Sequence, residues 1–520
     1  MLRVIKYLMF FLFFNFNSFG QFSPNSFSLP GDKNYLSKTT SSTPVSNSIL
    51  DIIAIGDTVW LGTSRAVSVS FDRGENWTNF YDSPPFGTDN VSALGYNNGV
   101  VWVATATSVE GTGGGTVPKG TGLKYTTNNG LTWTSIPQPV DNPDSNTVRY
   151  GNNILQALPI TVGEQNLTYD IAFTPGTVWI TSFAGGLRKS TNMGQTWQRV
   201  VLPPDDLNSI SPEDTLDFCL SPVSGSFCSE GNLNHRVFSV ISTDATTLYV
   251  GTANGINKST DNGISWVKFN HQNQEQPISG NFITALGYNS TNNTVWATSW
   301  KAEDLSEFYA VSSSINGGES WSVFLIDEKG HNFGFKGNNT IVATDNGAFR
   351  TSNQGNSWIL PNNIVDEKTG VSINTNIFYS ASSQGNDVWL GSADGLAKLT
   401  ETGFWVGEWK VYIASQPLTS NEEAYCFPNP FNPRQEPLKF KYSTGGMDAS
   451  VTIRIYNFSM NYIKTVIQNA PRNRTLEGPP DQQTWDGTDE NGNLLPNGVY
   501  FYSVEIDDNE PIFGKIIYLQ

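Results

Sequence analysis

Short segments in which apolar residues alternate with small or polar ones recur along most of the chain. Residues 58–63, TVWLGT, show the pattern. Alternation with a period of two predicts a β-strand, because successive side chains of a strand point to opposite faces of a sheet. Tracts of Leu, Ala, Glu and Lys at helical spacing are missing from the sequence. We therefore expect an all-β protein built from short strands and tight turns.

The TVWLGT segment is the second strand of a repeat that occurs seven times. Each copy follows an apolar first strand and precedes a third strand, a glycine turn and a tryptophan. Four strands repeated seven times predict a seven-bladed β-propeller over residues 47–415, whose closure into a ring protects the sheet edges. The second strands are TVWLGT (58–63), VVWVAT (100–105), TVWITS (177–182), TLYVGT (247–252), TVWATS (294–299), TIVATD (340–345) and DVWLGS (387–392).

The glycine turn lies between the predicted third and fourth strands and follows the pattern S/T-x-D/N-x-G-x-x-W. Six copies are intact, and the seventh, around Gly403, has decayed. The motif resembles the Asp-box, or BNR-like repeat, of sialidases, sortilin-type receptors and other propeller proteins. The intact copies are SFDRGENW (70–77), TTNNGLTW (126–133), STNMGQTW (190–197), STDNGISW (259–266), SINGGESW (314–321) and TSNQGNSW (351–358).

The third position of this turn distinguishes a catalytic or metal-binding role from a structural one. It is Asp in two copies and Asn in four, and an amide cannot act as a general base near neutral pH. Both side chains accept backbone hydrogen bonds in a turn, so the interchange favours a structural role. The glycine would supply a positive φ, and the Trp would bury a large ring. The residues assigned to structural turns are Asp72, Gly74, Trp77, Asn128, Gly130, Trp133, Asn192, Gly194, Trp197, Asp261, Gly263, Trp266, Asn316, Gly318, Trp321, Asn353, Gly355 and Trp358.

The charge, the N-terminal segment and the cysteines of the 520-residue chain indicate in which compartment it resides and which classes of partner it can bind. With 30 Lys and Arg against 47 Asp and Glu, the net charge of −17 disfavours nucleic acids and anionic membranes as partners. Residues 1–20 resemble a cleavable secretory signal and precede an N-terminal segment at 21–46, and we expect no membrane insertion after cleavage. In an oxidising compartment, Cys219 and Cys228 are candidates for a local disulfide, with Cys426 left free.

Strand order predicts which side of the propeller binds a ligand. If strands alternate in direction, the glycine turns lie on one face, and the second-to-third loops and blade connections lie on the other. The insertions after Thr105 and Ser299, and the blade connections at 135–168 and 201–236, all fall on this second face. Enlarged loops that share one face favour ligand binding there.

Acidic residues on these long loops leave an enzymatic alternative open. A pair of them would suit the acid and base of a glycoside hydrolase or lyase, although acidic loops are more often only solvated. The Phe-Arg-Ile-Pro-type motif and the arginine triad of sialidases are missing, and we assign no catalytic, cofactor-binding or metal-binding residue. The loop carboxylates are Glu110, Asp205, Asp206, Glu213, Asp214, Glu303 and Asp304.

A separate module is predicted after the last repeat, with a polar linker at 416–423 and the module itself at 424–520. Alternating apolar residues at 451–455 and 499–503 predict strands of a small β-sandwich. The motifs PNPFNP at 428–433, IYN at 455–457 and the WDGTDENG hairpin resemble the FlgD-type immunoglobulin-like domain. This resemblance implies a C-terminal domain similar to those that serve as sorting signals for type IX secretion.

These inferences predict a protein of a Gram-negative bacterium that is exported through the periplasm and is secreted or held at the cell surface. We expect it to bind a protein or a glycan on the long-loop face, without a cofactor and without catalysis. The C-terminal domain is expected to act in sorting or attachment and to engage the type IX secretion machinery. A sialidase-like glycoside hydrolase or a lyase is the alternative.

Overall fold

The computed structural model describes residues 40–111, 114–302, 304–368, 371–414, 424–435, 437–444, 448–472, 483–507 and 509–520. Within these ranges the regular elements are β-strands, together with one 3-10 helix, η1 (Leu233–His235). The predicted all-β class is therefore confirmed. The predicted signal at 1–20 and the predicted linker at 416–423 lie outside the described residues, as does most of the segment at 21–46.

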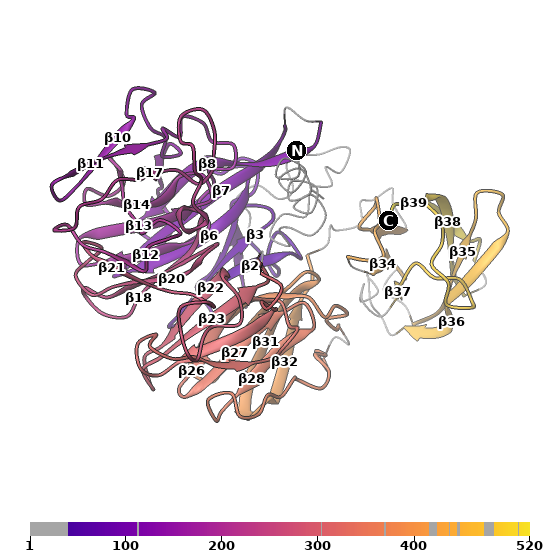
Figure 1. Ribbon diagram of the computed structural model, residues 1–520. Helices are drawn as coiled ribbons and strands as arrows, with labels where there is room; N and C mark the ends of the chain where they lie inside the picture. The colour runs from indigo at the N-terminus through magenta and orange to yellow at the C-terminus, as the bar shows by residue number, and fades with distance from the viewer. Residues whose placement is uncertain are drawn as a thin grey trace.

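Seven antiparallel sheets, which we number ring sheets 1 to 7, follow one another along the described part of the chain (Figure 1). In each, the strands are hydrogen-bonded in chain order. Ring sheet 1 contains β2 (Ile49–Ile55), β3 (Thr58–Thr63), β4 (Val67–Ser70) and β5 (Trp77–Asn79); ring sheet 2 contains β6 (Asn90–Asn97), β7 (Val100–Glu110), β8 (Thr116–Thr126) and β9 (Thr134–Ile136). Ring sheet 3 contains β12 (Ile171–Thr174), β13 (Thr177–Ser182), β14 (Gly186–Ser190) and β15 (Gln198–Arg199); ring sheet 4 contains β18 (Val237–Ser242), β19 (Leu248–Thr252), β20 (Gly255–Ser259) and β21 (Trp266–Phe269). Ring sheet 5 contains β22 (Phe282–Asn289), β23 (Thr294–Trp300), β24 (Ala310–Ser314) and β25 (Ser322–Phe324); ring sheet 6 contains β26 (Gly330–Lys336), β27 (Asn339–Thr344) and β28 (Gly347–Thr351); ring sheet 7 contains β29 (Phe378–Gln384), β30 (Asp387–Ser392), β31 (Gly395–Gly403) and β32 (Val406–Tyr412).

The first strands of the ring sheets contact one another in a closed cycle. Strand β2 contacts β6, and the contacts continue through β12, β18, β22, β26 and β29 before returning from β29 to β2. Each first strand is therefore innermost in its sheet, and the remaining strands lie progressively further out. A ring of radially arranged antiparallel sheets is the architecture of a β-propeller.

Aromatic rings fill the space between neighbouring ring sheets. The second strands bury Trp60, Trp102 and Trp179, among others, almost completely. The Trp that ends each glycine turn packs against the ring sheet before it. Trp133 lies 5.9 Å from Trp60 between ring centroids, and Trp77 lies 6.3 Å from Trp389, which joins the first ring sheet to the last. These contacts give large apolar burial at each junction.

Some segments that the sequence predicts as long loops form short strands. The hairpin of β10 (Thr147–Tyr150) and β11 (Asn153–Ala157) pairs with β17 (Cys219–Leu220), and β16 (Ser209–Ile210) pairs with β21. Strands β7 and β8 extend into the insertion after Thr105 as one long hairpin. Strand β1 (Thr40–Ser41) adds an outer strand beside β5. A disulfide joins Cys219 to Cys228 across a Cα–Cα distance of 5.8 Å.

The chain after residue 424 forms two further sheets. One consists of β33 (Ala424–Phe427), β34 (Leu438–Tyr442) and β37 (Thr484–Trp485), and the other of β35 (Ala449–Tyr456), β36 (Tyr462–Arg472), β38 (Gly498–Ile506) and β39 (Ile512–Tyr518). Both contribute to one core that includes Phe431, Phe440 and Trp485. Cys426 is a buried free thiol, and burial raises its pKa above the ordinary range. None of the described segments forms a helix with the length and hydrophobicity needed to cross a bilayer.

Candidate functional site

The antiparallel order of the strands divides the ring into two faces. Turns after the first and third strands of each ring sheet share one face, which we call the turn face. Loops after the second strands and connections between sheets share the other, which we call the long-loop face. The predicted Asp-box turns lie on the turn face, and the insertions after Thr105 and Ser299 follow second strands on the long-loop face. The connections at 135–168 and 201–236, which the sequence predicts for the long-loop face, extend in part to the turn face. There the Tyr150 hydroxyl donates to the Ile264 carbonyl at 2.8 Å, and Pro212 and Gly263 line one cavity.

On the turn face, the Asp-box side chains bond to their own turn. In the first ring sheet, the Ser70 hydroxyl donates to Asp72 Oδ1 at 2.8 Å, and the Gly74 N–H donates to Ser70 Oγ at 2.7 Å. The N–H of Asn76 donates to the same Asp72 oxygen at 2.8 Å. This network ties the four residues of the turn together.

The turns that carry Asn have the same three bonds. At Asn128 the corresponding distances are 3.0 Å from the Thr126 hydroxyl, 2.9 Å from the Gly130 N–H to Thr126 Oγ1, and 3.0 Å from the Thr132 N–H. The amide nitrogen of the side chain, Asn128 Nδ2, donates to Thr132 Oγ1 at 2.9 Å. Asn and Asp therefore act here through one acceptor oxygen, which requires no charge.

The loop carboxylates that the sequence analysis names do not gather into one site among the described residues. Asp205 accepts from the N–H groups of Leu233 and Asn234, both at 2.8 Å. Asp214 accepts from the Ser211 N–H at 2.7 Å, and Asp304 from the Ser306 N–H at 2.8 Å.

The other predicted loop acids are equally dispersed. Glu213 accepts from the Ser211 hydroxyl at 3.0 Å, whereas Glu110 and Asp206 are exposed on different segments. Glu303 lies outside the described residues. No group of three or more His, Cys, Asp or Glu side chains suited to a metal ion occurs in the part of the chain that the structure describes.

A row of aromatic side chains runs along the long-loop face, at or near the starts of successive inner strands and, at Trp300, at the end of the second strand β23. Neighbouring ring centroids are 4.6 to 6.2 Å apart, with edge-to-face or tilted geometry that favours aromatic attraction. We call this set the aromatic row. Its pairs are Tyr169–Phe238 at 5.3 Å, Phe238–Phe282 at 4.6 Å, Phe282–Trp300 at 6.0 Å, Trp300–His331 at 6.2 Å and His331–Tyr379 at 5.5 Å.

Two further rings and two cations extend the row outward. Tyr309 lies 6.2 Å from Trp300, and Phe183 lies 6.3 Å from Phe238. The Lys329 ammonium is 5.6 Å from the Trp300 ring and 5.1 Å from the Tyr309 ring, and the Arg236 guanidinium is 5.2 Å from the Phe183 ring. Phe282, Trp300, Phe183 and Tyr309 are partly exposed, so their rings are accessible to a ligand.

Two carboxylates lie where inner strands begin, near the centre of the ring: Asp51 is the third residue of β2, and Asp170 directly precedes β12. Asp51 accepts from the N–H groups of Ile52 at 2.9 Å and of Leu94, on the next ring sheet, at 3.1 Å. Asp170 accepts in the same way from Ile171 and from Val240 of the next ring sheet, both at 2.8 Å. Each acid therefore links two adjacent inner strands.

Burial changes the titration of both central acids. It raises the pKa of Asp51 to about 6, against the opposing effect of its two backbone hydrogen bonds. It raises the pKa of Asp170 to about 7, and the charge of Asp51 adds to this increase. Carboxyl groups with pKa values in this range are suited to proton transfer near neutral pH. The two acids therefore have the properties of an acid–base pair as well as a structural role.

An asparagine occupies the corresponding position of ring sheet 6. Asn332 follows the same bulge as Asp51, accepts from the Phe333 N–H at 2.8 Å, and extends its Nδ2 to within 3.4 Å of Asp51 Oδ1. Asp51, Asp170 and Asn332 are not among the candidate residues that the sequence motifs indicate. The signal that would have found them is a lone polar residue at the same place in otherwise apolar first strands, as in ILDIIAIG.

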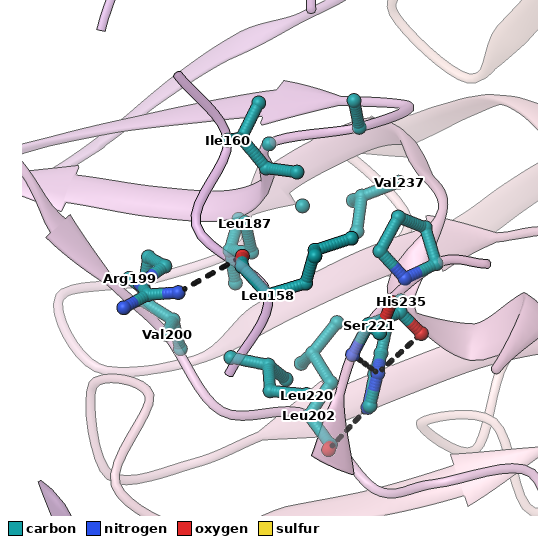
Figure 2. Close-up of a pocket in the computed structure, with 14 residues that line it drawn as sticks. Leu158, Ile160, Leu187, Arg199, Val200, Leu202, Leu220, Ser221, His235 and Val237 are labelled. Carbon is teal, nitrogen blue, oxygen red and sulfur yellow. Dashed lines mark hydrogen bonds between the residues drawn. The ribbon is translucent and has the colours of Figure 1, made fainter. Parts of the chain in front are cut away.

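A small cavity lies where η1 and the inserted sheet meet ring sheet 3 (Figure 2). Its volume of about 20 Å³ is enough for about one water molecule. His235 beside it accepts at Nδ1 from the Ser221 N–H at 3.2 Å, and its Nε2 lies 3.2 Å from the Leu202 carbonyl. Burial lowers the pKa of His235 to about 4, so the ring is neutral and serves packing.

No known protein-family model matches the sequence, and no curated protein matches it. Among solved structures, PorZ, a surface component of the type IX secretion system of Porphyromonas gingivalis, is similar over 91% of this chain and 66% of its own, with 13% identity and a TM-score of 0.32. An ancestral GH74 enzyme matches 91% of this chain and 60% of its own, with 15% identity and a TM-score of 0.48. The extracellular domain of a putative one-component system from B. thetaiotaomicron matches 91% and 86%, with 11% identity and a TM-score of 0.33. The chain thus spans about two thirds or less of the length of the first two.

Proposed function

We propose that this chain is an exported binding protein, a seven-bladed Asp-box propeller that holds a glycan on the aromatic row of its long-loop face. The accessible rings of Phe282 and Trp300, flanked by Tyr309, are the observation that supports it most. Such rings stack on the apolar faces of sugar rings, and the nearby Lys329 adds a hydrogen-bond donor. The Asp-box turns and the Cys219–Cys228 disulfide are proposed to be structural.

The test of this proposal is a glycan array followed by titration of the best ligand. Trp300→Ala and Phe282→Ala should each weaken binding roughly tenfold, because each removes a stacking surface. Phe71→Ala is the matched control, since Phe71 is 45% exposed on the turn face and should not contact the ligand. A ligand whose affinity is unchanged in both row variants, or a peptide that binds in place of every glycan, would contradict the glycan assignment.

A second candidate is a glycoside hydrolase or lyase, because Asp51 and Asp170 lie close enough for the charge of Asp51 to raise the pKa of Asp170. These carboxyl groups, rather than the dispersed loop acids, would act as acid and base beneath the aromatic row. Cleavage of a polysaccharide by the wild-type chain, abolished in both Asp51→Asn and Asp170→Asn, would support it. Activity that persists in these folded variants would exclude the pair.

The C-terminal module is proposed to be an FlgD-type immunoglobulin-like domain that directs type IX sorting or attachment at the cell surface. The two-sheet packing of residues 424–518 and the buried motif residues Phe431 and Trp485 support this proposal. Expression of a chain that ends at residue 423 in a type IX-competent bacterium should leave the protein in the periplasm. Normal appearance of the truncated chain at the surface would defeat the sorting role.

A further inference from the structure

A cavity of about 230 Å³ lies at the outer part of the ring, away from the aromatic row. It is bounded by the β10–β11 hairpin, by strands β14 and β15, and by the Asp-box turn of ring sheet 4. Its polar side chains are Arg149, Lys189, Gln198, Arg199 and Tyr150, and no carboxylate lines it. Three cations around one cavity are unusual in a chain whose net charge is −17.

Two lysines, Lys258 and Lys398, occupy positions equivalent to that of Lys189 in other ring sheets. Lys189, Lys258 and Lys398 are each paired, on the third strand, with the aromatic residue of the second strand in ring sheets 3, 4 and 7. Each ammonium lies over that ring, at 5.2 Å, 5.5 Å and 5.3 Å respectively. The three lysines thus have the same local setting.

Their ammonium groups differ in what they bond to. Lys258 donates to the Gly317 carbonyl at 2.9 Å, and Lys398 donates to the Arg73 carbonyl at 2.8 Å, in both cases on the Asp-box turn of the next ring sheet. Within the described residues, Lys189 makes no such hydrogen bond and no ion pair, and it lines the cavity beside Gly263 and Ile264 of the next turn instead. A half-buried ammonium without a hydrogen-bond acceptor is costly unless water or a ligand supplies one.

The other charges near the cavity leave Lys189 and Arg149 as its available cations. Arg199 donates to the Ser145 carbonyl at 2.6 Å and lies 3.7 Å from Asp141, so the inserted segment occupies it. Arg149 makes only a 3.2 Å hydrogen bond from Nε to the Gly151 carbonyl among the described residues, so its terminal nitrogens make no hydrogen bond there.

Three acids lie near the cavity without lining it. The Glu213, Asp214 and Asp261 carboxylates accept hydrogen bonds from Ser211 and Ser265 of their own loops. Burial and the charges of these acids raise the pKa of Tyr150 beyond its ordinary range. The acids are therefore close enough to weaken the binding of an anion in the cavity. The cavity is therefore suited to a modest rather than a tight affinity.

We propose that this cavity binds the oxyanion of an acidic monosaccharide, with Lys189 and Arg149 as the charged donors and Gln198 as a neutral one. A carboxylate or a sulfate would accept from Lys189 the kind of hydrogen bond that Lys258 and Lys398 donate to carbonyl groups. The volume suits one sugar ring rather than a polymer. This site is independent of the aromatic row, so the two proposals can fail separately.

The experiment is isothermal titration of the full chain with glucuronate, glucose 6-sulfate, inorganic sulfate and neutral glucose at low ionic strength. Glucuronate and glucose 6-sulfate should bind, and glucose should not. Lys189→Gln should weaken binding at least roughly tenfold, because a charge-assisted hydrogen bond is lost. Inorganic sulfate that binds as well as the sugar acids would show that the site recognises a free oxyanion and would overturn the sugar assignment.

Lys258→Gln is the matched control, because it removes the equivalent lysine whose ammonium is already engaged. It should lower the unfolding temperature but leave the affinity for glucuronate within about twofold. If Lys189→Gln fails to fold, Arg149→Gln, at an exposed position, provides the second test and should weaken binding in the same direction. Absence of saturable binding of any anion to the wild-type chain, or equal affinity in the Lys189 and Lys258 variants, would overturn the proposal.

Discussion

At the scale of single residues, the acids of the Asp-box turns behave as hydrogen-bond acceptors rather than as charges. Asp261 accepts from the Ser265 N–H at 2.9 Å and from the Ser265 hydroxyl at 2.5 Å, and Ser259 donates to its Oδ1 at 2.7 Å. Four sibling turns satisfy the same acceptor geometry with Asn. Oδ1 has the same role in all six turns. The second atom accepts a hydrogen bond from the Ser265 hydroxyl when it is a carboxylate oxygen, and it donates one to the corresponding hydroxyl when it is an amide nitrogen.

We predict that Asp261→Asn changes the free energy of unfolding by less than about 0.5 kcal/mol, whereas Asp261→Ala lowers it by about 1 to 2 kcal/mol. The alanine leaves the Ser265 N–H and the Ser259 hydroxyl without their acceptor, and the asparagine does not. Denaturant unfolding of both variants measures the difference. Equal destabilisation by Asn and Ala would mean that the negative charge itself matters.

Asp170 should make stability depend on pH in the direction opposite to that of most paired acids. Burial raises its pKa from 3.8 in the unfolded chain to about 7 in the folded protein. Between these values the folded state binds more protons than the unfolded state, so the free energy of unfolding falls as pH rises from about 4 to 7. Below pH 4 both states are protonated, and the contribution is fully present.

We predict that Asp170→Asn removes this part of the pH dependence, on the order of 4 kcal/mol between pH 4 and pH 8. An amide keeps the acceptor for the Ile171 or the Val240 N–H and does not ionise. The measurement is the unfolding midpoint of wild type and variant across that pH range. Parallel curves for the two proteins would show that Asp170 ionises normally in the folded state.

At the scale of elements, the junction between ring sheets depends on the close approach of each glycine turn to the aromatic ring of the sheet before it. Gly74 has φ = +87°, and a Cβ at this position would lie 2.7 Å from Trp389 and would also collide with the Tyr412 hydroxyl. Gly56, in the turn between β2 and β3, also has a positive φ of +58°, but its Cβ would meet nothing within 4 Å. A comparison of these two glycines therefore distinguishes the effect of backbone strain from the effect of packing.

We predict that Gly56→Ala costs about 1 kcal/mol of unfolding free energy, from the left-handed backbone alone. Gly74→Ala should cost at least about 3 kcal/mol, because the same strain is joined by overpacking against Trp389 at the junction that closes the ring. Calorimetric unfolding of both variants compares them. Equal costs would show that the interface between the first and last ring sheets yields easily.

The strands that the sequence predicts well are those whose pattern repeats. TVWLGT and its relatives are confirmed as second strands because alternation, β-branched residues and the periodic glycine turn all indicate the same structure. Strands β10, β11, β16 and β17 lay inside predicted loops, because they are only two to five residues long. Strand β10 pairs locally with β11, whereas β17 pairs with β11 and β16 pairs with β21 across many residues of the chain. Short strands stabilised by such pairing leave little local signal.

The central acids and the cavity lysine escaped prediction for a different reason. Asp51 and Asp170 acquire their shifted pKa values from the ring that surrounds them, which no segment of the sequence encodes by itself. Lys189 looks identical to Lys258 in the sequence, and only the neighbouring turn distinguishes a bonded ammonium from one that faces a cavity. Loop acids, by contrast, were easy to see and turned out to be spread over separate loops.

At the scale of the whole molecule, a buried ion pair connects the C-terminal module to ring sheet 7. Asp394 lies in the turn between β30 and β31, on the long-loop face, and forms an ion pair with Lys439 of β34; both side chains are 0% exposed. Phe427 of the neighbouring strand packs against the apolar cluster of ring sheet 7. The two parts of the chain therefore share an interface with a charged contact inside it.

We predict that Asp394→Asn loosens this interface, because it replaces the buried carboxylate that contacts the Lys439 ammonium with a neutral amide. Breaking a buried pair by removing one partner costs about 3 to 5 kcal/mol, and the chain can limit that cost by undocking and hydrating the lysine. The expected result is faster proteolytic separation of the two parts and a melting transition that divides into two. Lys464→Met is the control. Lys464 forms an ion pair of 3.2 Å with Asp486, whose side chain is largely exposed, so the loss of stability should be small.

A double variant, Asp394→Leu with Lys439→Met, distinguishes a broken charge pair from a damaged fold. Apolar side chains of similar volume need no countercharge, so the double variant should regain most of the protease resistance that Asp394→Asn loses. That recovery would show that the interface is held by packing and that the ion pair mainly fixes which surfaces meet. If Asp394→Asn itself separates no faster than wild type, the pair contributes nothing to docking, and the C-terminal module must be held through Phe427 and its apolar neighbours alone.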